Sequence, residues 1–136
     1  MGYGTGTAWY KPAGVTEINR DLVESIKTAI KLGYTHLDGA EVYGTETELG
    51  VAIKESGVAR DKLFVTTKVI TNIADIPNAI DSSLEKLQLS YVDLYVCPHL
   101  NDRTPKPTCP IDISFILLSL QNPIRISKTL GVLWRK

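Results

Sequence analysis

The chain has few cysteines and no excess of charge. It carries two cysteines among 136 residues, Cys97 and Cys109, which is too few for a disulfide framework, and their spacing matches no metal-binding motif. Its 15 basic and 15 acidic side chains give a formal net charge of zero. This balance gives no reason to expect nucleic acid or an anionic membrane surface as a partner. We therefore expect neither a metal site nor binding of nucleic acid.

The sequence also lacks the long apolar runs that mark membrane spans and leader peptides. Residues 115–120 (FILLSL) stop well short of the roughly 18 residues that a span requires. Met1 is followed at once by Gly2, with no basic or apolar leader. We expect a cytoplasmic protein with no membrane-bound part.

What the sequence does have is the composition of a globular protein, with 43% hydrophobic and 22% charged residues. Three segments rich in β-branched and aromatic residues begin at intervals of 28 residues: 35–40 (THLDGA), 63–69 (LFVTTKV) and 91–97 (YVDLYVC). A fourth candidate strand is Tyr3–Ala8. Strands separated by helix-length segments are typical of βα units and a parallel sheet.

The first segment between these strands has a clear helical pattern. Apolar residues recur every four positions from Leu22 to Ile30. Asn19 or Asp21 could cap the start of this helix, and Gly33 stands where a helix commonly ends.

The next two segments are helical by the same reasoning. Thr45–Glu48 (TETE) matches the capping box and predicts a helix that stops at Gly57. Pro77 falls in the first turn of a third helix, where its missing N–H costs nothing. The apolar stripe of that helix is Ile76, Ile80, Leu84 and Leu87. Residues 3–97 are therefore predicted to alternate strand and helix, with four strands and three helices.

The composition changes after Cys97. Five of the seven prolines lie from Pro98 to Pro123, and only one of the ten glycines lies beyond Gly57. Residues 1–98 carry 9 basic and 13 acidic side chains (net −4), whereas residues 99–136 carry 6 and 2 (net +4). Within this part, residues 111–120 fit a buried strand or a short helix equally well. We predict a domain over residues 1–97 and a divergent, proline-rich, basic tail over residues 98–136.

Four polar residues are predicted to meet at one end of the sheet. The carboxyl ends of parallel strands collect active sites, and here they bring Asp38 with Tyr43, then Lys68, then His99. A lysine cation near a phenol favours loss of its proton, and a carboxylate could hold that lysine. An imidazole could orient a carbonyl oxygen. Such a set is suited to protonating an alkoxide.

Plainer interpretations of these residues remain open at this point. Asp38 and Lys68 could be ordinary polar groups at strand ends, Tyr43 a packing aromatic, and His99 a solvated loop residue. The segment Gly2–Thr7 (GYGTGT) hints at a nucleotide loop, but it lacks the third glycine of GxGxxG and no strand precedes it.

Three stretches of the sequence resemble the aldo-keto reductases, over residues 2 to about 96. They are GYGTGTAW, GYTHLDGAEVYGTETELGVAIKESGVARDKLFVTTKV and SSLEKLQLSYVDLYV. The most specific piece is D-x-A-x-x-Y followed by G-x-E-x-x-L-G, here Asp38, Ala40, Tyr43, Gly44, Glu46, Leu49 and Gly50.

This resemblance implies a (β/α)8 barrel that binds NADPH and reduces an aldehyde or ketone to an alcohol. By the family pattern, Tyr43 is the general acid, Lys68 assists it and Asp38 pairs with Lys68. Gly4 and Thr5, together with Asp38, would lie by the cofactor, and Trp9 would line the substrate pocket. The expected partner is thus a small carbonyl compound.

The sequence departs from the family pattern at two points. The family's histidine after the fourth strand falls at position 98, which is Pro98, so His99 is the candidate one residue later. A full barrel takes about 250 residues, so 136 residues predict an α/β partial barrel of about four βα units followed by an irregular tail. An alternative is an inactive half-barrel fragment from a truncated or frameshifted gene, or an interaction module that self-associates through its open sheet edge.

Overall fold

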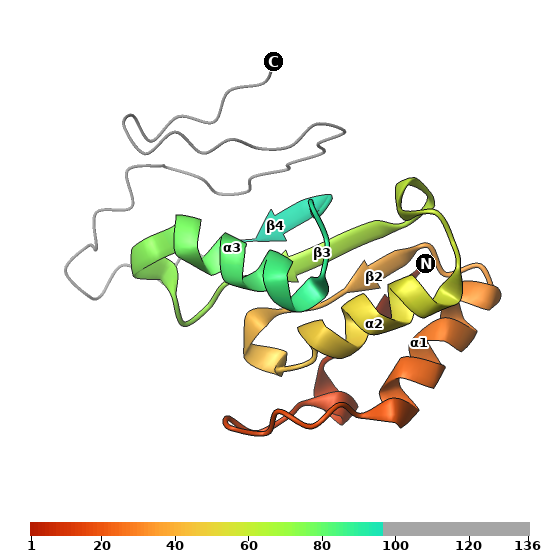
Figure 1. The fold of residues 1–136 in the computed structure, drawn as a ribbon, viewed down its shortest axis with the longest axis horizontal. Coiled ribbons are helices and arrows are strands. Elements are labelled where there is room, and N and C mark those ends of the chain that lie inside the picture. The colour runs from red at the N-terminus through yellow and green to blue at the C-terminus, as the bar shows by residue number, and fades with distance from the viewer. Residues whose placement is uncertain (97–136) are drawn as a thin grey trace, which may run out of the picture.

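Four parallel strands alternate with three helices in the computed structural model, which describes residues 1–96 (Figure 1). The strands are β1 (Gly2–Gly4), β2 (His36–Asp38), β3 (Phe64–Lys68) and β4 (Leu94–Val96). The helices are α1 (Arg20–Lys31), α2 (Glu46–Ser56) and α3 (Ile76–Leu87). Single 3-10 turns also occur: η1 (Thr7–Trp9), η2 (Glu41–Tyr43), η3 (Arg60–Lys62) and η4 (Ile73–Asp75).

The sheet has the strand order β1-β2-β3-β4, and every neighbouring pair is parallel. This order confirms the predicted succession of strands and helices and the α/β class with a parallel sheet. The predicted tail, residues 98–136, lies outside the described residues, and His99 lies there with it.

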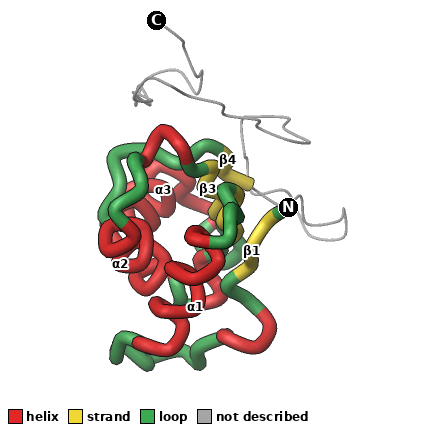
Figure 2. The backbone as a smooth tube through the Cα atoms, turned by 90° about the vertical axis from the view of Figure 1, so that its right-hand side faces the viewer, coloured by secondary structure: helices red, strands yellow, loops and turns green. Residues whose placement is uncertain are grey.

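All three helices cover the same face of the sheet (Figure 2). Burial alternates along β2 and β4, because the side chains of Leu37 and Tyr95 point under the helices while their neighbours in each strand are half-exposed. The buried residues from both layers form one core, made of Leu22, Val23, Ile26, Ile30, Leu37, Leu49, Ala52, Ile53, Leu63, Val65, Val69, Ala79, Leu87, Val92 and Tyr95. The opposite face of the sheet is therefore the one that carries the polar residues of the predicted site.

The ends of α1 are those that the sequence predicts. Of the two candidate caps, Asn19 begins the helix, because its side-chain oxygen accepts a hydrogen bond from the N–H of Leu22 at 3.1 Å. Gly33 follows the last turn with φ +91°, a left-handed conformation that glycine adopts without strain. The N–H of Tyr34 then closes onto the carbonyl of Ala29 at 3.0 Å, which completes a glycine-terminated helix end.

The capping box predicted at the start of α2 is wrong, although the helix itself is present. Thr45 is the residue before the helix, but its hydroxyl makes no capping bond. It donates instead to the carbonyl oxygen of Thr5 at 3.1 Å and to the Thr5 hydroxyl at 3.0 Å. The Glu48 carboxylate is likewise engaged by Lys11 and Asn19. Both polar groups are fully buried, and partners distant in sequence have replaced the local ones.

The first strand is shorter than the predicted segment Tyr3–Ala8. It ends at Gly4, and Thr7–Trp9 forms a 3-10 turn in which Thr7 has φ +50°. A left-handed conformation in a β-branched residue is strained by roughly 1–3 kcal/mol and is maintained only by its surroundings. The glycine-rich segment therefore turns out of the sheet at the edge of the predicted site.

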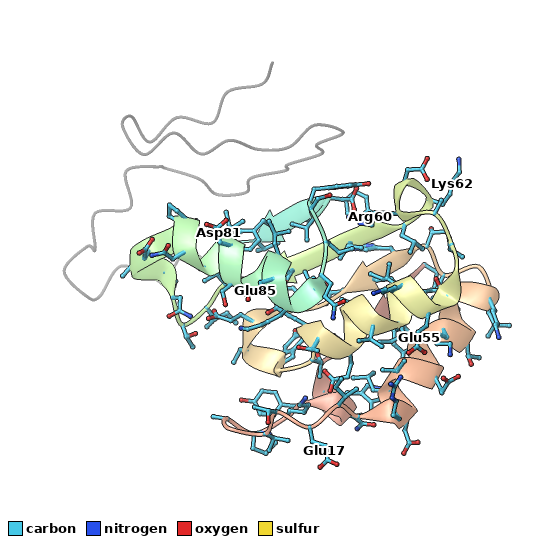
Figure 3. All side chains as sticks on the ribbon, in the orientation of Figure 1. Glu17, Glu55, Arg60, Lys62, Asp81 and Glu85 are labelled. Carbon is cyan, nitrogen blue, oxygen red and sulfur yellow. The ribbon has the colours of Figure 1, made fainter. Side chains whose placement is uncertain are left out.

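Asp93, in the predicted strand segment 91–97, has a structural role and lies outside the predicted site. Asp93 accepts hydrogen bonds from the Arg60 guanidinium at 2.6 Å and from the N–H of Val65 at 2.7 Å. Arg60 also lies over the ring of Tyr91, 4.1 Å from its centroid. These contacts join the amino-terminal ends of β3 and β4, and Figure 3 shows Arg60 at that end of the sheet.

Among residues 1–96, no helix is long and apolar enough to cross a membrane.

Gly50 in the middle of α2 marks a contact between backbones, so we predict that Gly50→Ala destabilises the protein. A Cβ at this position would lie 2.1 Å from the carbonyl oxygen of Leu87 at the end of α3. Because the obstructing atom is backbone, relief requires α2 and α3 to separate. We expect a loss of about 1–3 kcal/mol in the free energy of unfolding, measured by urea denaturation.

The matched control is Lys54→Ala on the exposed side of the same helix. Alanine is the best helix former, so this variant should match the parent protein within about 0.5 kcal/mol. An equally stable Gly50→Ala protein would contradict the close packing of α2 against α3.

Candidate active site

The ammonium group of Lys68 is held at the carboxyl end of the sheet. Its Nζ donates to both carboxylate oxygens of Asp38, each at 2.7 Å, and to the carbonyl oxygen of Gly39 at 2.8 Å. An ammonium has three N–H donors, and these three acceptors use all of them. Lys68 is therefore a fixed positive charge rather than a mobile one.

Strand register explains why these two side chains meet. Asp38 is opposite Thr66 in the parallel pairing of β2 with β3, so Lys68 lies two residues further along the same face. Its long side chain returns across the sheet to reach the carboxylate. Both side chains stay partly open to solvent, with exposed fractions of 24% for Lys68 and 36% for Asp38.

Tyr43 is brought beside this pair by the short turn η2, which follows β2. The Lys68 ammonium lies 5.2 Å from the centroid of the Tyr43 ring, close enough for an attractive cation–π contact. On its other side, the Tyr43 carbonyl accepts a hydrogen bond from the N–H of Lys11 at 3.0 Å. The structure thus brings together the three predicted residues Asp38, Tyr43 and Lys68.

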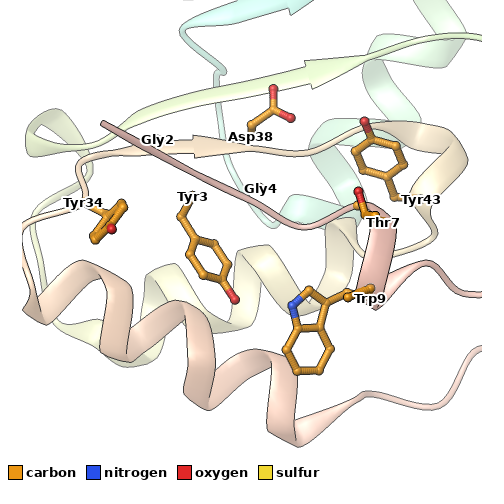
Figure 4. Close-up of a pocket in the computed structure, with 10 residues that line it drawn as sticks. Gly2, Tyr3, Gly4, Thr7, Trp9, Tyr34, Asp38 and Tyr43 are labelled. Atoms are coloured by element: carbon orange, nitrogen blue, oxygen red, sulfur yellow. The ribbon is translucent and has the colours of Figure 1, made fainter.

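A cleft of about 470 Å³ opens next to Asp38 and Tyr43 (Figure 4). The residues that line it are Gly2, Tyr3, Gly4, Gly6, Thr7, Ala8, Trp9, Tyr34, Asp38 and Tyr43. Backbone from the glycine-rich segment forms one wall, and aromatic rings form much of the rest. Trp9 and Gly4 both line the cleft, and their contacts with substrate and cofactor stay predictions.

Thr5 has a different environment from Gly4. It is fully buried, and its N–H donates to the carbonyl of Asp38 at 2.9 Å. Its hydroxyl also bonds to that carbonyl, at 3.2 Å, and accepts a bond from Thr45. These bonds hold the chain leaving β1 against the end of β2. Contact of Thr5 with a cofactor stays a prediction.

Gly6 is a site residue that sequence reasoning missed. A Cβ at this position would lie 2.8 Å from Cζ of the Tyr43 ring, so only glycine lets the backbone approach the ring this closely. The glycine-rich pattern is visible in the sequence, but the ring that Gly6 contacts is 37 residues away. No local pattern distinguishes this glycine from Gly4.

Glu41 is a second residue that the sequence did not single out. Its carboxylate accepts hydrogen bonds from the backbone N–H groups of Ile70 and Thr71, both at 3.3 Å, and from the side chain of Asn72. Burial raises the pKa of the Glu41 carboxyl, but hydrogen bonds from Thr71, Ile70 and Asn72 outweigh it and leave the pKa below its ordinary value. Glu41 therefore ties the loop after Lys68 to the turn that carries Tyr43.

The sequence matches the family described as Aldo/keto reductase family over residues 1–133. The chain belongs to the aldo-keto reductase family. The match continues past Val96, where the resemblance from motifs ended, into residues that the structure does not describe. The predicted boundary between residues 97 and 98 stays a prediction.

Relatives of this aldo-keto reductase include an NAD/NADP-dependent indole-3-acetaldehyde reductase from Schizosaccharomyces pombe. It is 52% identical over 94 residues, which are 69% of this chain and 33% of the relative. A glyoxal reductase from Bacillus subtilis is 46% identical over 83 residues, or 59% of this chain and 30% of the relative. The chain thus spans about a third of the length of the curated relatives it matches.

Solved structures of the family share the fold of the described residues. An aldo/keto reductase from Brucella melitensis superposes with a TM-score of 0.59 at 37% identity. The superposition covers 71% of this chain and 34% of that one. The four strands and three helices described for this aldo-keto reductase are therefore one part of a barrel in its relatives.

Gly6→Ala should displace the Tyr43 ring while leaving the aldo-keto reductase folded. The added methyl meets the far end of a side chain that can rotate away, so the free energy of unfolding should change by less than about 1 kcal/mol. The displacement is measured by NMR, as a shift of the Tyr43 ring resonances in protein labelled at tyrosine.

Gly4→Ala is the matched control, because a Cβ there has nothing within 4 Å. Its Tyr43 resonances should coincide with those of the parent protein. Unmoved Tyr43 resonances in Gly6→Ala would disprove the close approach.

The hydrogen bonds to Glu41 predict that the stabilisation of the loop at Ile70–Asn72 depends on pH. The folded-state pKa lies below the ordinary value of 4.5, so the stabilisation is fully present above that value and is lost as pH falls through the lower folded pKa. The amide resonances of Ile70 and Thr71, followed by NMR, should therefore shift with a midpoint below about pH 4.5.

In Glu41→Gln this titration should disappear. In Glu85→Gln, on the exposed side of α3, it should persist unchanged. A titration that survives Glu41→Gln would assign it to another carboxyl group.

Proposed function

We propose that this chain carries the catalytic half-site of an NADPH-dependent carbonyl reductase in which Tyr43 donates a proton to the substrate oxygen. The observation that carries the proposal is the Lys68 ammonium, fixed by Asp38 and lying 5.2 Å from the Tyr43 ring at the edge of a cleft. A fixed cation at this place would stabilise the negative charge that the Tyr43 oxygen carries once its proton has left. This is the property a general acid needs when an alkoxide forms.

The residues of the cleft fit the neutral end of a nicotinamide cofactor. Gly4 leaves open space where a side chain would stand, and glycine backbone and aromatic rings offer flat surfaces to a planar ring. None of the described residues that line the cleft is lysine or arginine, so the fit concerns the nicotinamide end and not the phosphates. When bound, the reduced cofactor supplies a hydride to the carbonyl carbon.

The chain's own groups account for the proton. As the carbonyl oxygen gains negative charge, the Tyr43 hydroxyl would transfer its proton to that oxygen, and the product is an alcohol. The Lys68 cation would stabilise the phenolate left behind, and Asp38 keeps that cation in place. Solvent reaching the open cleft would return the proton to Tyr43. His99, outside the described residues, is proposed to orient the carbonyl oxygen.

Small aldehydes are the proposed substrates. The names of two relatives specify glyoxal and indole-3-acetaldehyde, which differ greatly in size. The open cleft lined by Trp9 admits both an extended dicarbonyl and an aromatic aldehyde. We propose a cytoplasmic enzyme and suggest these two compounds as first assay substrates, with NADPH and NADH compared.

The alternative of an inactive half-barrel receives less support from the site, because the side chains of Asp38, Tyr43 and Lys68 lie together beside the cleft. It would be favoured if the folded chain neither bound NADPH nor oxidised it. A particle size that rises with concentration would then indicate self-association through a sheet edge.

Tyr43→Phe should lower kcat/KM for carbonyl reduction by about 100- to 10,000-fold, the usual contribution of a general acid. The phenylalanine ring preserves the contacts with Gly6 and Lys68 but has no proton to donate. The measurement is the initial rate of NADPH oxidation, followed by absorbance, over a range of aldehyde concentrations.

Tyr91→Phe is the matched control, because Tyr91 lies under Arg60 at the opposite end of the sheet. It should retain the parent activity. Full activity in Tyr43→Phe would exclude Tyr43 as the acid.

A further inference from the structure

The segment of residues 10–19 joins the wall of the cleft to helix α1 and touches the proposed acid. It begins directly after Trp9, which lines the cleft, and ends at Asn19, which caps α1. Near its start, the N–H of Lys11 donates to the Tyr43 carbonyl at 3.0 Å. Figure 3 shows Glu17 on this segment, at the edge of the molecule next to α1. Its position therefore bears on both Trp9 and Tyr43.

A single buried carboxylate holds both ends of this segment. Glu48, in α2, is fully buried, and its Oε1 accepts hydrogen bonds from Lys11 Nζ at 2.7 Å and from the N–H of Asn19 at 2.9 Å. Lys11 Nζ also donates to the carbonyl oxygen of Glu17 at 3.0 Å. The side chain of Lys11 is only 11% exposed. The ion pair is thus shielded from water and from salt.

The arrangement is a poor one for stability alone. The second oxygen of Glu48, Oε2, is buried without a hydrogen-bond partner among the described residues. Removing a carboxylate and an ammonium from water costs free energy, and apolar residues of similar size usually do as well or better. The carboxylate instead fixes the position of the segment, because one of its oxygens binds both Lys11 and Asn19, which lie near the two ends of the segment.

We propose that Glu48 is a positioning residue for the candidate active site. With Lys11, it holds segment 10–19 against η2, so that Trp9 and Tyr43 keep their places on the two sides of the cleft. This inference rests on the proposed function for its catalytic consequence. The structural consequence, a displaced Trp9, does not depend on it.

The test uses the full chain with Trp134→Phe, which leaves Trp9 as its one tryptophan. In Glu48→Gln and in Lys11→Met, acrylamide should quench Trp9 fluorescence more strongly than in the parent. In the aldehyde assay, kcat/KM should fall by about 10- to 100-fold, as expected when a positioning contact is lost. Part of this fall should come from a rise in KM, because Trp9 forms part of the cleft. Loss of the acid itself would instead lower kcat.

Two variants separate positioning from a general effect of charge. Lys11→Arg keeps the ion pair, so its acrylamide quenching and its KM should both be closer to those of the parent than the values for Lys11→Met. Glu55→Gln, on the same helix, breaks exposed ion pairs with Arg20 and Lys27 and should change neither.

Unchanged quenching in folded Glu48→Gln and Lys11→Met proteins would overturn the inference. If either single variant fails to fold, the double variant Lys11→Met/Glu48→Gln decides, because it leaves no unpaired buried charge. If the parent shows no carbonyl reduction, the proposed function fails, and the quenching result still decides the place of Glu48.

Discussion

The candidate site depends on one interaction, the hydrogen bonds of the Lys68 ammonium to Asp38 and Gly39. It joins the ends of two neighbouring parallel strands, and it sets a positive charge beside a tyrosine ring. An ammonium with all three donors engaged cannot turn away from its partners, so the charge stays fixed next to the cleft. The carbonyl of Asp38 also accepts hydrogen bonds from the N–H and the hydroxyl of Thr5. These bonds anchor the glycine-rich segment that forms the cleft wall.

Around this pair, carboxylates accept hydrogen bonds from residues of distant chain segments. Glu41 accepts hydrogen bonds from the loop after β3, and Glu48 accepts them from the segment after β1. Glu46 accepts a hydrogen bond from the Thr67 hydroxyl at 2.6 Å. Glu46 and Glu48 are buried, which costs free energy, and each of the three carboxylates joins chain segments far apart in the sequence. Directional hydrogen bonds define where a loop lies more narrowly than hydrophobic contact does, and a site built on loops needs that definition.

The βα alternation could be predicted from the sequence because it rests on local chemistry. Apolar periodicity, the Asn19 cap and the Gly33 stop all act within a few residues, and the structure has all of them. Asp38, Tyr43 and Lys68 could be predicted because parallel strands bring their carboxyl ends together. The capping box at Thr45 was a local pattern too, and it was wrong, because buried hydroxyls and carboxylates take the best partner that the fold offers.

The sequence by itself therefore determined the order of elements, the face of each helix and the strand ends at which polar residues gather. Those features follow from the repeat of 3.6 residues in a helix and two in a strand, which any window of sequence displays. Only the tertiary structure decided that Gly6 lies against the Tyr43 ring, that Glu41 faces the loop after Lys68, and that Glu48 joins Lys11 to Asn19. These contacts depend on how the strands register and how the helices pack, and no short stretch of sequence contains both partners.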